Sequence, residues 1–326
     1  MGHDKLRKFA ENETFSCLLQ PSAQELLADG YFHLRDHAVK GHWDQFFAGL
    51  PVAGSPRQNF ASLIPPTAEQ RVPPVHEDFR ARKSSGFQDS FGGGHGFAGE
   101  TGKPAALVLE LGCGKGEYTV ALAERDPERN YVGVDIKGAR LWKGAKYATE
   151  HRLPNVAFLR TRVEFITAFF APGEVSEVWL TFSDPQYRSE NSRLCSPLFL
   201  ERYRSFMRPG GIVHLKTDSR FLHEYALAVC RANNLQVLCN TVDLYGQQVE
   251  AQPVVRGVQT FYEQLFLEQG YPITYLSFVI DHEGAYVSPR DPEEFDAKAW
   301  RAAEGPRLLF GHDSAETRRQ KLHAAE

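Results

Sequence analysis

Two aspartates follow short hydrophobic runs in the middle of the sequence, and their positions favour chemistry at the edge of a sheet. Asp184 follows EVWLTF (177–182), and Asp218 follows GIVHLKT (211–217). If both runs are parallel strands, their carboxyl ends lie at the edge where open α/β proteins bind ligands. Each aspartate alone could instead begin a turn or cap a helix, as Asp-Pro commonly does. Two carboxylates at the ends of neighbouring strands favour a site.

A glycine-rich segment, GCGKG (112–116), follows the predicted strand LVLEL (107–111) and precedes a predicted helix. Its backbone can approach a ligand closely, although glycine turns also join strands to helices without binding anything. A dinucleotide-binding G-x-G-x-x-G motif places the third glycine one residue later, which disfavours a dehydrogenase. The spacing resembles the S-adenosylmethionine loop of class I methyltransferases. Glu110 in the strand supports this, as does Asp135 in the next one, because an acidic side chain can accept hydrogen bonds from both ribose hydroxyls.

Short β-rich runs alternate with helical patterns from about residue 105, which indicates a parallel sheet wrapped by helices on both faces. We expect an α/β fold of the Rossmann-like kind with a seven-stranded, mostly parallel sheet. The predicted strands are 107–111, 131–136, 156–160, 177–182, 211–217, 236–242 and 273–280. The predicted helices are 117–125, 139–151, 163–170, 198–207, 220–233 and 258–268.

Residues outside this pattern predict a division of the chain into four parts. The first part, 1–50, is weakly helical and amphipathic, and we expect an N-terminal arm. Pro-Pro pairs, GGGHG and few aliphatic residues make 51–104 a flexible insertion that cannot form a packed core. The expected catalytic domain spans 105–282, and a polar tail spans 283–326.

The bulk composition is that of a soluble globular protein, with 42% hydrophobic and 24% charged residues among 326. The net charge of −4 disfavours a protein whose whole surface binds nucleic acid. It is still compatible with a local basic patch. No apolar run approaches the ~18 residues of a membrane-spanning helix, and the first residues lack a secretory signal. We therefore expect a cytoplasmic protein without membrane association.

The five cysteines form no Cys-x-x-Cys pair and are odd in number. This pattern predicts reduced thiols, with no disulfide and no zinc or other metal site.

Six segments occur in order along residues 105–280: VLELGCGKGEYTVALA, NYVGVDIKGARLWKGAK, NVAFLRT, WLTFSDPQ, FLERYRSFMRPGGIVHLKTDS and TFYEQLFLEQG. Together they closely resemble the bacterial tRNA (guanine-N7-)-methyltransferases, a class I S-adenosylmethionine-dependent family. The opening MGHDKLRKFAENE also looks like the N-terminal arm of that family's variants. The resemblance implies methylation of guanine N7 in the variable loop of tRNA, with S-adenosyl-L-methionine as cofactor. It implies tRNA as the partner and no obligate protein partner, as a monomer or homodimer.

The resemblance also implies roles for single residues. Asp184 matches the catalytic-site aspartate of the family's F-P-D-P motif and would also contact the cofactor. The other cofactor-binding positions are Glu110, Gly112, Gly114, Asp135 and Arg162, and the substrate-binding positions are Arg188, Asp218, Thr260 and Glu263.

Three departures from the family pattern bear on these roles. The F-P-D-P motif is FSDP (182–185) here, so one rigidifying proline is missing. The basic run that follows is diluted to QYRSENSR, which leaves Arg188 and Arg193 for phosphate contact. Arg162 stands where the family more usually has an acidic or amide residue near the adenine.

The implied reaction needs alignment more than a strong base, because guanine N7 already carries a lone pair and no proton. A fixed carboxylate near the ring favours the positive charge that develops there, and Asp184 could also accept from the guanine N1–H and N2–H edge. We expect Asp218 to share this task, and the sequence leaves open which of the two carboxylates meets the base. N7 in an A-form helix faces a deep, narrow groove, so a loop guanosine or an unstacked one is expected. The aromatic candidates for stacking are Phe182, Tyr187, Tyr203 and Tyr262.

Two alternatives remain beside this interpretation. The missing proline and thinned basic run would also fit a methyltransferase of the same fold that acts on another RNA or a small molecule. A non-catalytic RNA-binding relative is the second, and calorimetric titration with S-adenosylmethionine separates it from an enzyme.

Overall fold

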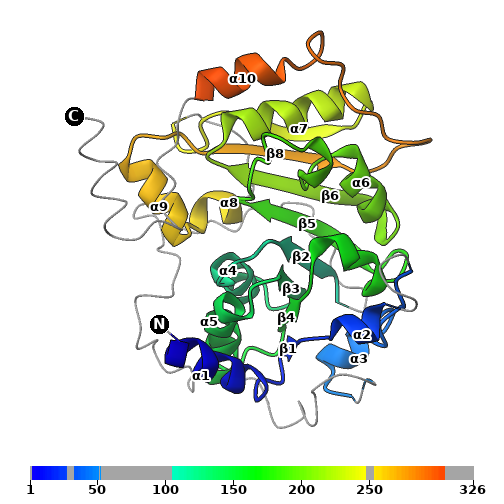
Figure 1. Cartoon of the computed structure of the whole chain (residues 1–326), viewed down its shortest axis with the longest axis vertical. Helices are drawn as coiled ribbons and strands as arrows, with labels where there is room; N and C mark the ends of the chain where they lie inside the picture. The colour runs from blue at the N-terminus through cyan, green and yellow to red at the C-terminus, as the bar shows by residue number, and fades with distance from the viewer. Residues whose placement is uncertain (1, 28–32, 51, 53–104, 247–252, 305–326) are drawn as a thin grey trace.

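A mixed sheet with helices on both faces dominates the computed structural model, which describes residues 2–27, 33–50, 52, 105–246 and 253–304 (Figure 1). The expected α/β fold is thereby confirmed. The predicted flexible insertion, 51–104, lies outside the described residues apart from Val52. The last part of the predicted tail, 305–326, also lies outside them.

The sheet has eight strands within the described ranges, one more than the seven expected. Their order is β1-β4-β3-β2-β5-β6-β8-β7, and β8 runs antiparallel to both of its neighbours. The additional strand, β1, pairs in parallel with β4 and is two residues long, too short to show alternation in the sequence. The strands are β1 Leu18–Leu19, β2 Leu107–Leu111, β3 Asn130–Asp135, β4 Val156–Arg160, β5 Val175–Thr181, β6 Met207–Thr217, β7 Val237–Thr241 and β8 Thr274–Val279.

All six predicted helices have counterparts in the structure, and three of these predictions change. The 163–170 helix is a 3₁₀ helix, the 198–207 helix ends at Arg204 because β6 begins at Met207, and the 258–268 helix begins at Phe261. Among the described residues, no helix has the length and apolar character needed to span a bilayer. The helices are α1 Gly2–Asn12, α2 Ala23–Leu26, α3 Trp43–Phe47, α4 Glu117–Arg125, α5 Gly138–Glu150, η3 Val163–Ala168, η4 Glu190–Ser192, α6 Pro197–Arg204, α7 Arg220–Ala232, α8 Pro253–Gly257, α9 Phe261–Glu268 and α10 Ala297–Glu304.

The two faces of the sheet belong to different hydrophobic clusters. In β2, Leu107, Leu109 and Leu111 enter a cluster that includes side chains of α6 and α7, whereas Val108 enters one that includes α4 and α5. Both faces of the central strands are therefore buried, which is why they read as continuous hydrophobic runs. Such strands hold their carboxyl ends rigidly at one edge.

Segments at both ends of the described chain pack on this unit. Helix α1 packs against α5, and the buried Asn12 side chain donates a hydrogen bond to the Gly138 carbonyl at 3.0 Å (Figure 1). Helix α10 packs against α7, and Phe295 just before it is part of the core. The folded unit therefore includes residues before 105 and after 282.

Candidate active site at the carboxyl edge of the sheet

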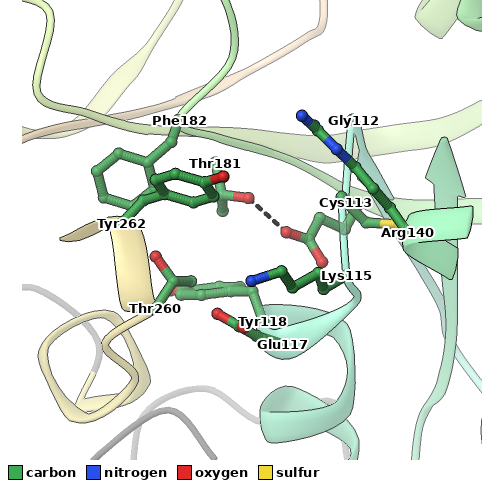
Figure 2. A pocket seen from close by; sticks show the side chains of 12 residues that line it. Gly112, Cys113, Lys115, Glu117, Tyr118, Arg140, Thr181, Phe182, Thr260 and Tyr262 are labelled. Atoms are coloured by element: carbon green, nitrogen blue, oxygen red, sulfur yellow. Dashed lines mark hydrogen bonds between the residues drawn. The ribbon is translucent and has the colours of Figure 1, made fainter. Parts of the chain in front are cut away.

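A pocket opens at the carboxyl ends of β2 and β5, beside the first residues of α4 and α9 (Figure 2). Its volume is about 500 Å³, counting the part open to solvent. Phe182 and Tyr262 lie on one side of it, and Arg140 lies on the other (Figure 2). The lining residues are Glu110, Gly112, Cys113, Gly114, Lys115, Glu117, Tyr118, Arg140, Thr181, Phe182, Thr260 and Tyr262.

The glycine loop after β2 leaves open space where side chains would otherwise project. Gly112 and Gly114 have φ angles of 78° and 58°, in the left-handed region that favours glycine. A Cβ atom added to either residue would meet nothing within 4 Å. At Gly116, by contrast, a Cβ would collide with the Phe158 ring. The first two glycines thus leave room for a ligand, and the third lets the loop pack on the core.

Glu110 lines the pocket from β2 and is only 3% exposed. Its carboxylate accepts hydrogen bonds from the Thr119 amide at 2.8 Å and from the Thr119 hydroxyl. It also accepts one from the Thr181 hydroxyl (Figure 2). Burial raises the pKa of Glu110 to about 7, and the bonds from Thr119 and Thr181 oppose that rise. A cation placed in the pocket would favour the ionised carboxylate.

Asp135 lies at the end of β3, directly behind the glycine loop. Its Oδ2 accepts from the Gly114 amide at 3.0 Å, and its Oδ1 accepts from the Lys137 amide at 2.7 Å. The carboxylate therefore fixes the loop that lines the pocket. Because a carboxylate has about four acceptor sites, Asp135 keeps capacity for the hydroxyl groups of a ligand.

The start of α9 forms the wall opposite the glycine loop. Thr260 caps this helix: its hydroxyl accepts from the Glu263 amide at 3.2 Å, and the Glu263 carboxylate accepts from the Thr260 amide at 3.3 Å. Glu117 in α4 accepts from the Phe261 amide at 3.1 Å. The Lys115 ammonium lies 5.3 Å from the Phe261 ring centroid and 5.9 Å from that of Tyr262. These contacts tie the first turns of α4 and α9 together across the pocket.

A fully buried ion pair supports the same wall from behind. The Lys216 ammonium on β6 lies 2.7 Å from the Glu263 carboxylate, and both side chains have zero exposed area. The ammonium also donates to the carbonyls of Val255 at 2.7 Å and Val258 at 2.8 Å. Burial lowers the pKa of Lys216, while Glu263 opposes that change. Glu263, a predicted substrate residue, thus lies inside the protein and fixes α9 to the sheet.

The loop after β5 extends from the pocket toward solvent. Phe182 lines the pocket, whereas Asp184 and Arg188 are exposed and lie outside the lining. The Asp184 Oδ1 accepts from the Gln186 amide at 2.9 Å, which is the turn geometry expected of Asp-Pro. This carboxylate is therefore accessible to a large substrate at the rim.

Arg193 does not remain available for phosphate, and that expectation is wrong. Its side chain is 5% exposed, and its guanidinium carbon lies 4.8 Å from the Phe221 ring centroid and 4.3 Å from that of Tyr225. The two rings on α7 enclose the cation and hold it by cation–π attraction. Arg188 is the exposed arginine of this segment.

Two further predicted residues also lie outside the lining. Asp218 is partly buried and directly precedes Ser219, the residue that caps α7 by accepting from the Leu222 amide at 3.1 Å. Arg162 is exposed, and its guanidinium lies 3.4 Å from the Glu164 carboxylate. The predicted residues that share the pocket wall are Glu110, Gly112, Gly114 and Thr260, with Asp135 behind the loop.

Six lining residues were not predicted from the sequence: Cys113, Lys115, Glu117, Tyr118, Arg140 and Thr181. Lys115 and Glu117 lie within or directly after the glycine loop, so their positions were a usable signal. Tyr118 and Arg140 reach the pocket only through the packing of α4 and α5 against the sheet, which a linear pattern does not give. Among the aromatic candidates, Phe182 and Tyr262 line the pocket, whereas Tyr203 is fully buried in the core.

The pocket suits a ligand with a cationic centre and hydroxyl groups. Glu110, Glu117 and Asp135 are acidic, and the space above Gly112 and Gly114 is open. The Tyr118 hydroxyl is buried and has no hydrogen-bond partner among the described residues. Because buried hydroxyls are normally paired, it can serve a bound ligand. S-adenosylmethionine, with its sulfonium, ammonium and ribose hydroxyls, fits this set of donors and acceptors.

Comparisons with known proteins agree with this arrangement. A family model described as "Putative methyltransferase" matches residues 104–276. A tRNA (guanine-N(7)-)-methyltransferase of Christiangramia forsetii is 40% identical over 279 residues, covering 85% of this chain and 98% of that protein. Its namesake in Bacteroides thetaiotaomicron is 47% identical over 195 residues, covering 60% of this chain and 77% of that protein.

A solved structure, the antibiotic-resistance methyltransferase Kmr, has a TM-score of 0.40 and 19% identity, covering 56% of this chain and 89% of that one. The match of the family model over more than half of the chain, together with a relative covered almost end to end, shows that this chain belongs to the tRNA (guanine-N(7)-)-methyltransferase family.

Proposed function

We propose that this protein transfers a methyl group from S-adenosyl-L-methionine to N7 of a guanine in the variable loop of tRNA. One observation carries the proposal: in a chain of this family, the glycine loop, Glu110 and the start of α9 line one pocket. The exposed Asp184 and Arg188 lie on the loop that leaves this pocket toward solvent. Donor and acceptor would meet where that loop joins the pocket.

The bound cofactor would supply an electrophilic methyl group. Glu110 would stabilise its cationic methionine part, Gly112 and Gly114 would leave room for it, and Asp135 would accept from the ribose hydroxyls. The buried Tyr118 hydroxyl would gain a partner from the same ligand.

Arg162 was also predicted to bind the cofactor. It pairs with Glu164 in this conformation, so a role beside the adenine requires that pair to open.

Asp184 would orient the guanine and stabilise the charge that develops on it. N7 needs no general base because its lone pair is already available, so alignment supplies most of the acceleration. The carboxylate would accept from the N1–H and N2–H edge, which an adenine does not present. As the ring becomes cationic, the same negative charge would stabilise the transition state. Asp218, at the neighbouring strand end, would assist as a second acceptor.

The remaining protein–RNA contacts would lie at the rim of the pocket. Arg188 is exposed and would bind a backbone phosphate. Phe182 and Tyr262 line one side of the pocket and would stack on the unpaired base. Thr260 would contact the substrate from the start of α9, while the buried Glu263 would act by holding that helix in place.

The proposed setting is the cytoplasm, where tRNA is modified. We propose a monomer or homodimer without an obligate protein partner. Analytical ultracentrifugation of the purified chain, alone and with tRNA, would test this part by itself.

The test of the reaction uses purified protein, tritiated S-adenosylmethionine and an unmodified tRNA transcript. A matched transcript replaces the variable-loop guanosine by adenosine, and mass spectrometry of the digested product identifies the modified base. We expect 7-methylguanosine in the first transcript and none at that position in the second. Absence of incorporation at saturating enzyme would contradict the reaction, and equal incorporation into both transcripts would contradict the target position.

A further inference from the structure

The loop that carries Asp184 has a backbone that needs external support. Phe182 and Gln186, on either side of the aspartate, have φ angles of 50° and 47°. Residues other than glycine adopt this left-handed region at a conformational cost, and they persist there only when surrounding contacts fix them. Two such residues within five positions mean that the loop does not hold its shape by its own preferences.

Tyr187 is one of the side chains that join this loop to the rest of the protein, and it is the one that reaches α10. Its ring packs edge-on against Phe221 of α7, with centroids 5.0 Å apart and planes at 61°. Its hydroxyl donates to the Glu304 Oε2 atom at 2.5 Å. The Arg301 guanidinium lies 5.5 Å from the centroid of the same ring. Glu304 and Arg301 belong to α10, more than a hundred residues later in the chain.

Glu304 makes a second contact, at the beginning of α7. Its Oε1 accepts from the Phe221 amide at 3.4 Å. That amide belongs to the first turn of α7, where unpaired N–H groups and the helix dipole favour a negative charge. Asp218 lies three residues before Phe221, at the end of β6. One carboxylate therefore joins the loop of Asp184 and Arg188 to the helix start that follows Asp218.

We infer that Glu304 and Tyr187 are positioning residues that set the distance between the two substrate loops, an inference that rests on the proposed function. Helix α10 would act as a clasp laid across α7, holding the Asp184 loop through Tyr187 and the start of α7 through its backbone. The residues of the clasp lie outside the pocket lining. The clasp should therefore govern the productive placement of tRNA and leave cofactor affinity unchanged.

The experiment compares the full chain with two single variants, Tyr187→Phe and Glu304→Ala, with the double variant that combines them, and with the conservative variant Glu304→Gln. Glu293→Ala is the matched control, because it removes an exposed carboxylate from the same C-terminal segment. The measurements are kcat and KM for tRNA, the Kd for S-adenosylmethionine and the unfolding midpoint. Amide hydrogen exchange across residues 183–189 reports the loop directly.

We expect each single variant to lose about tenfold in kcat/KM for tRNA, the effect of one charge-assisted hydrogen bond on a positioned group. The double variant should lose no more than Glu304→Ala, because both changes remove the same contact. Glu304→Gln should be intermediate, since one carbonyl oxygen replaces two acceptors. The Kd for S-adenosylmethionine should not change, and exchange across 183–189 should be faster in Glu304→Ala than in Glu293→Ala.

Unchanged kcat/KM in both single variants, additive losses in the double variant, or weakened cofactor binding would each overturn the inference. Failure of the proposed function gives a different result, because the unaltered protein would then methylate no tRNA. Hydrogen exchange still decides in that case. Equal amide hydrogen exchange across 183–189 in Glu304→Ala and Glu293→Ala would overturn the inference. Faster exchange in Glu304→Ala alone would support it.

Discussion

Replacing Glu110 by glutamine should stabilise the free protein above neutral pH while weakening its cofactor binding. Glutamine has nearly the same shape, and its carbonyl can still accept from the Thr119 amide while its amide group faces the Thr181 hydroxyl. The substitution therefore removes a charge and keeps the hydrogen bonds. Only the cost of burying the ionised carboxylate should disappear.

The magnitude follows from the pKa of Glu110, which burial raises from 4.5 to about 7. A raised pKa means that the native protein binds more protons than the unfolded chain between these values. The native protein therefore loses stability as pH rises from about 4.5 to 7. At 1.36 kcal/mol per unit, this loss amounts to about 3 kcal/mol. The Glu110→Gln variant does not undergo this loss. The difference in unfolding free energy between the variant and the unaltered protein should therefore grow by about 3 kcal/mol in the variant's favour between pH 4.5 and pH 8.

The assay is urea unfolding without cofactor at several pH values from 5 to 8. Glu293→Gln is the control, because Glu293 is exposed and its substitution removes a carboxylate that bears no cost of burial. The difference in stability between the control and the unaltered protein should stay flat across the assay range. Calorimetry at pH 8 should show S-adenosylmethionine binding the Glu110 variant roughly 10- to 100-fold more weakly. A stability difference for Glu110→Gln that does not change with pH would refute the reasoning.

Three further substitutions test the site and its support. Lys216→Met should lower the unfolding free energy by about 3–5 kcal/mol, because it leaves the buried Glu263 carboxylate without its cation; the double change with Glu263→Gln should recover much of this loss in urea unfolding. Asp184→Asn should lower kcat for tRNA methylation by about 100-fold, while the asparagine oxygen can still hold the turn. Arg188→Ala should weaken tRNA binding measured by filter retention and reduce the slope of log K against log salt by about 1.

A specific result would contradict each of these three predictions. Equal loss in the single and double changes at Lys216 would show that the pair does not act as a unit. Full activity of Asp184→Asn would remove the carboxylate from the reaction, and an unchanged salt slope would show that Arg188 meets no phosphate.

Much of the sheet could be predicted from the sequence, because burial of both faces leaves a strong local signal. The run LVLEL gives β2 with its observed ends, and Glu117 to Arg125 gives α4 in the same way. The missing strand, β1, has two residues and depends on pairing with β4, so no local period reveals it. The predicted end of a helix differs from the observed end where a single side chain fixes it, as Thr260 does by capping α9.

The candidate site could be predicted in part, for a similar reason. The glycine loop and Glu110 can be recognised from neighbouring residues in the sequence. The structure brings them together with Thr260 in one pocket. The position of Lys216 also indicates a buried ion pair, because a lysine inside a hydrophobic strand must be paired when it is buried. The pairing of Tyr187 with Glu304 joins residues 117 positions apart, and no local pattern contains it.

The short strand β1 constrains how the chain is put together during synthesis. Leu18 pairs with Phe158, which the ribosome adds 140 residues later. At about 5–20 residues per second, the N-terminal arm therefore spends roughly 7–28 seconds without its partner strand. Strands β2 and β3, in the middle of the sheet, are complete before β4 is made, so they can pair before the earliest segment of the chain is secured.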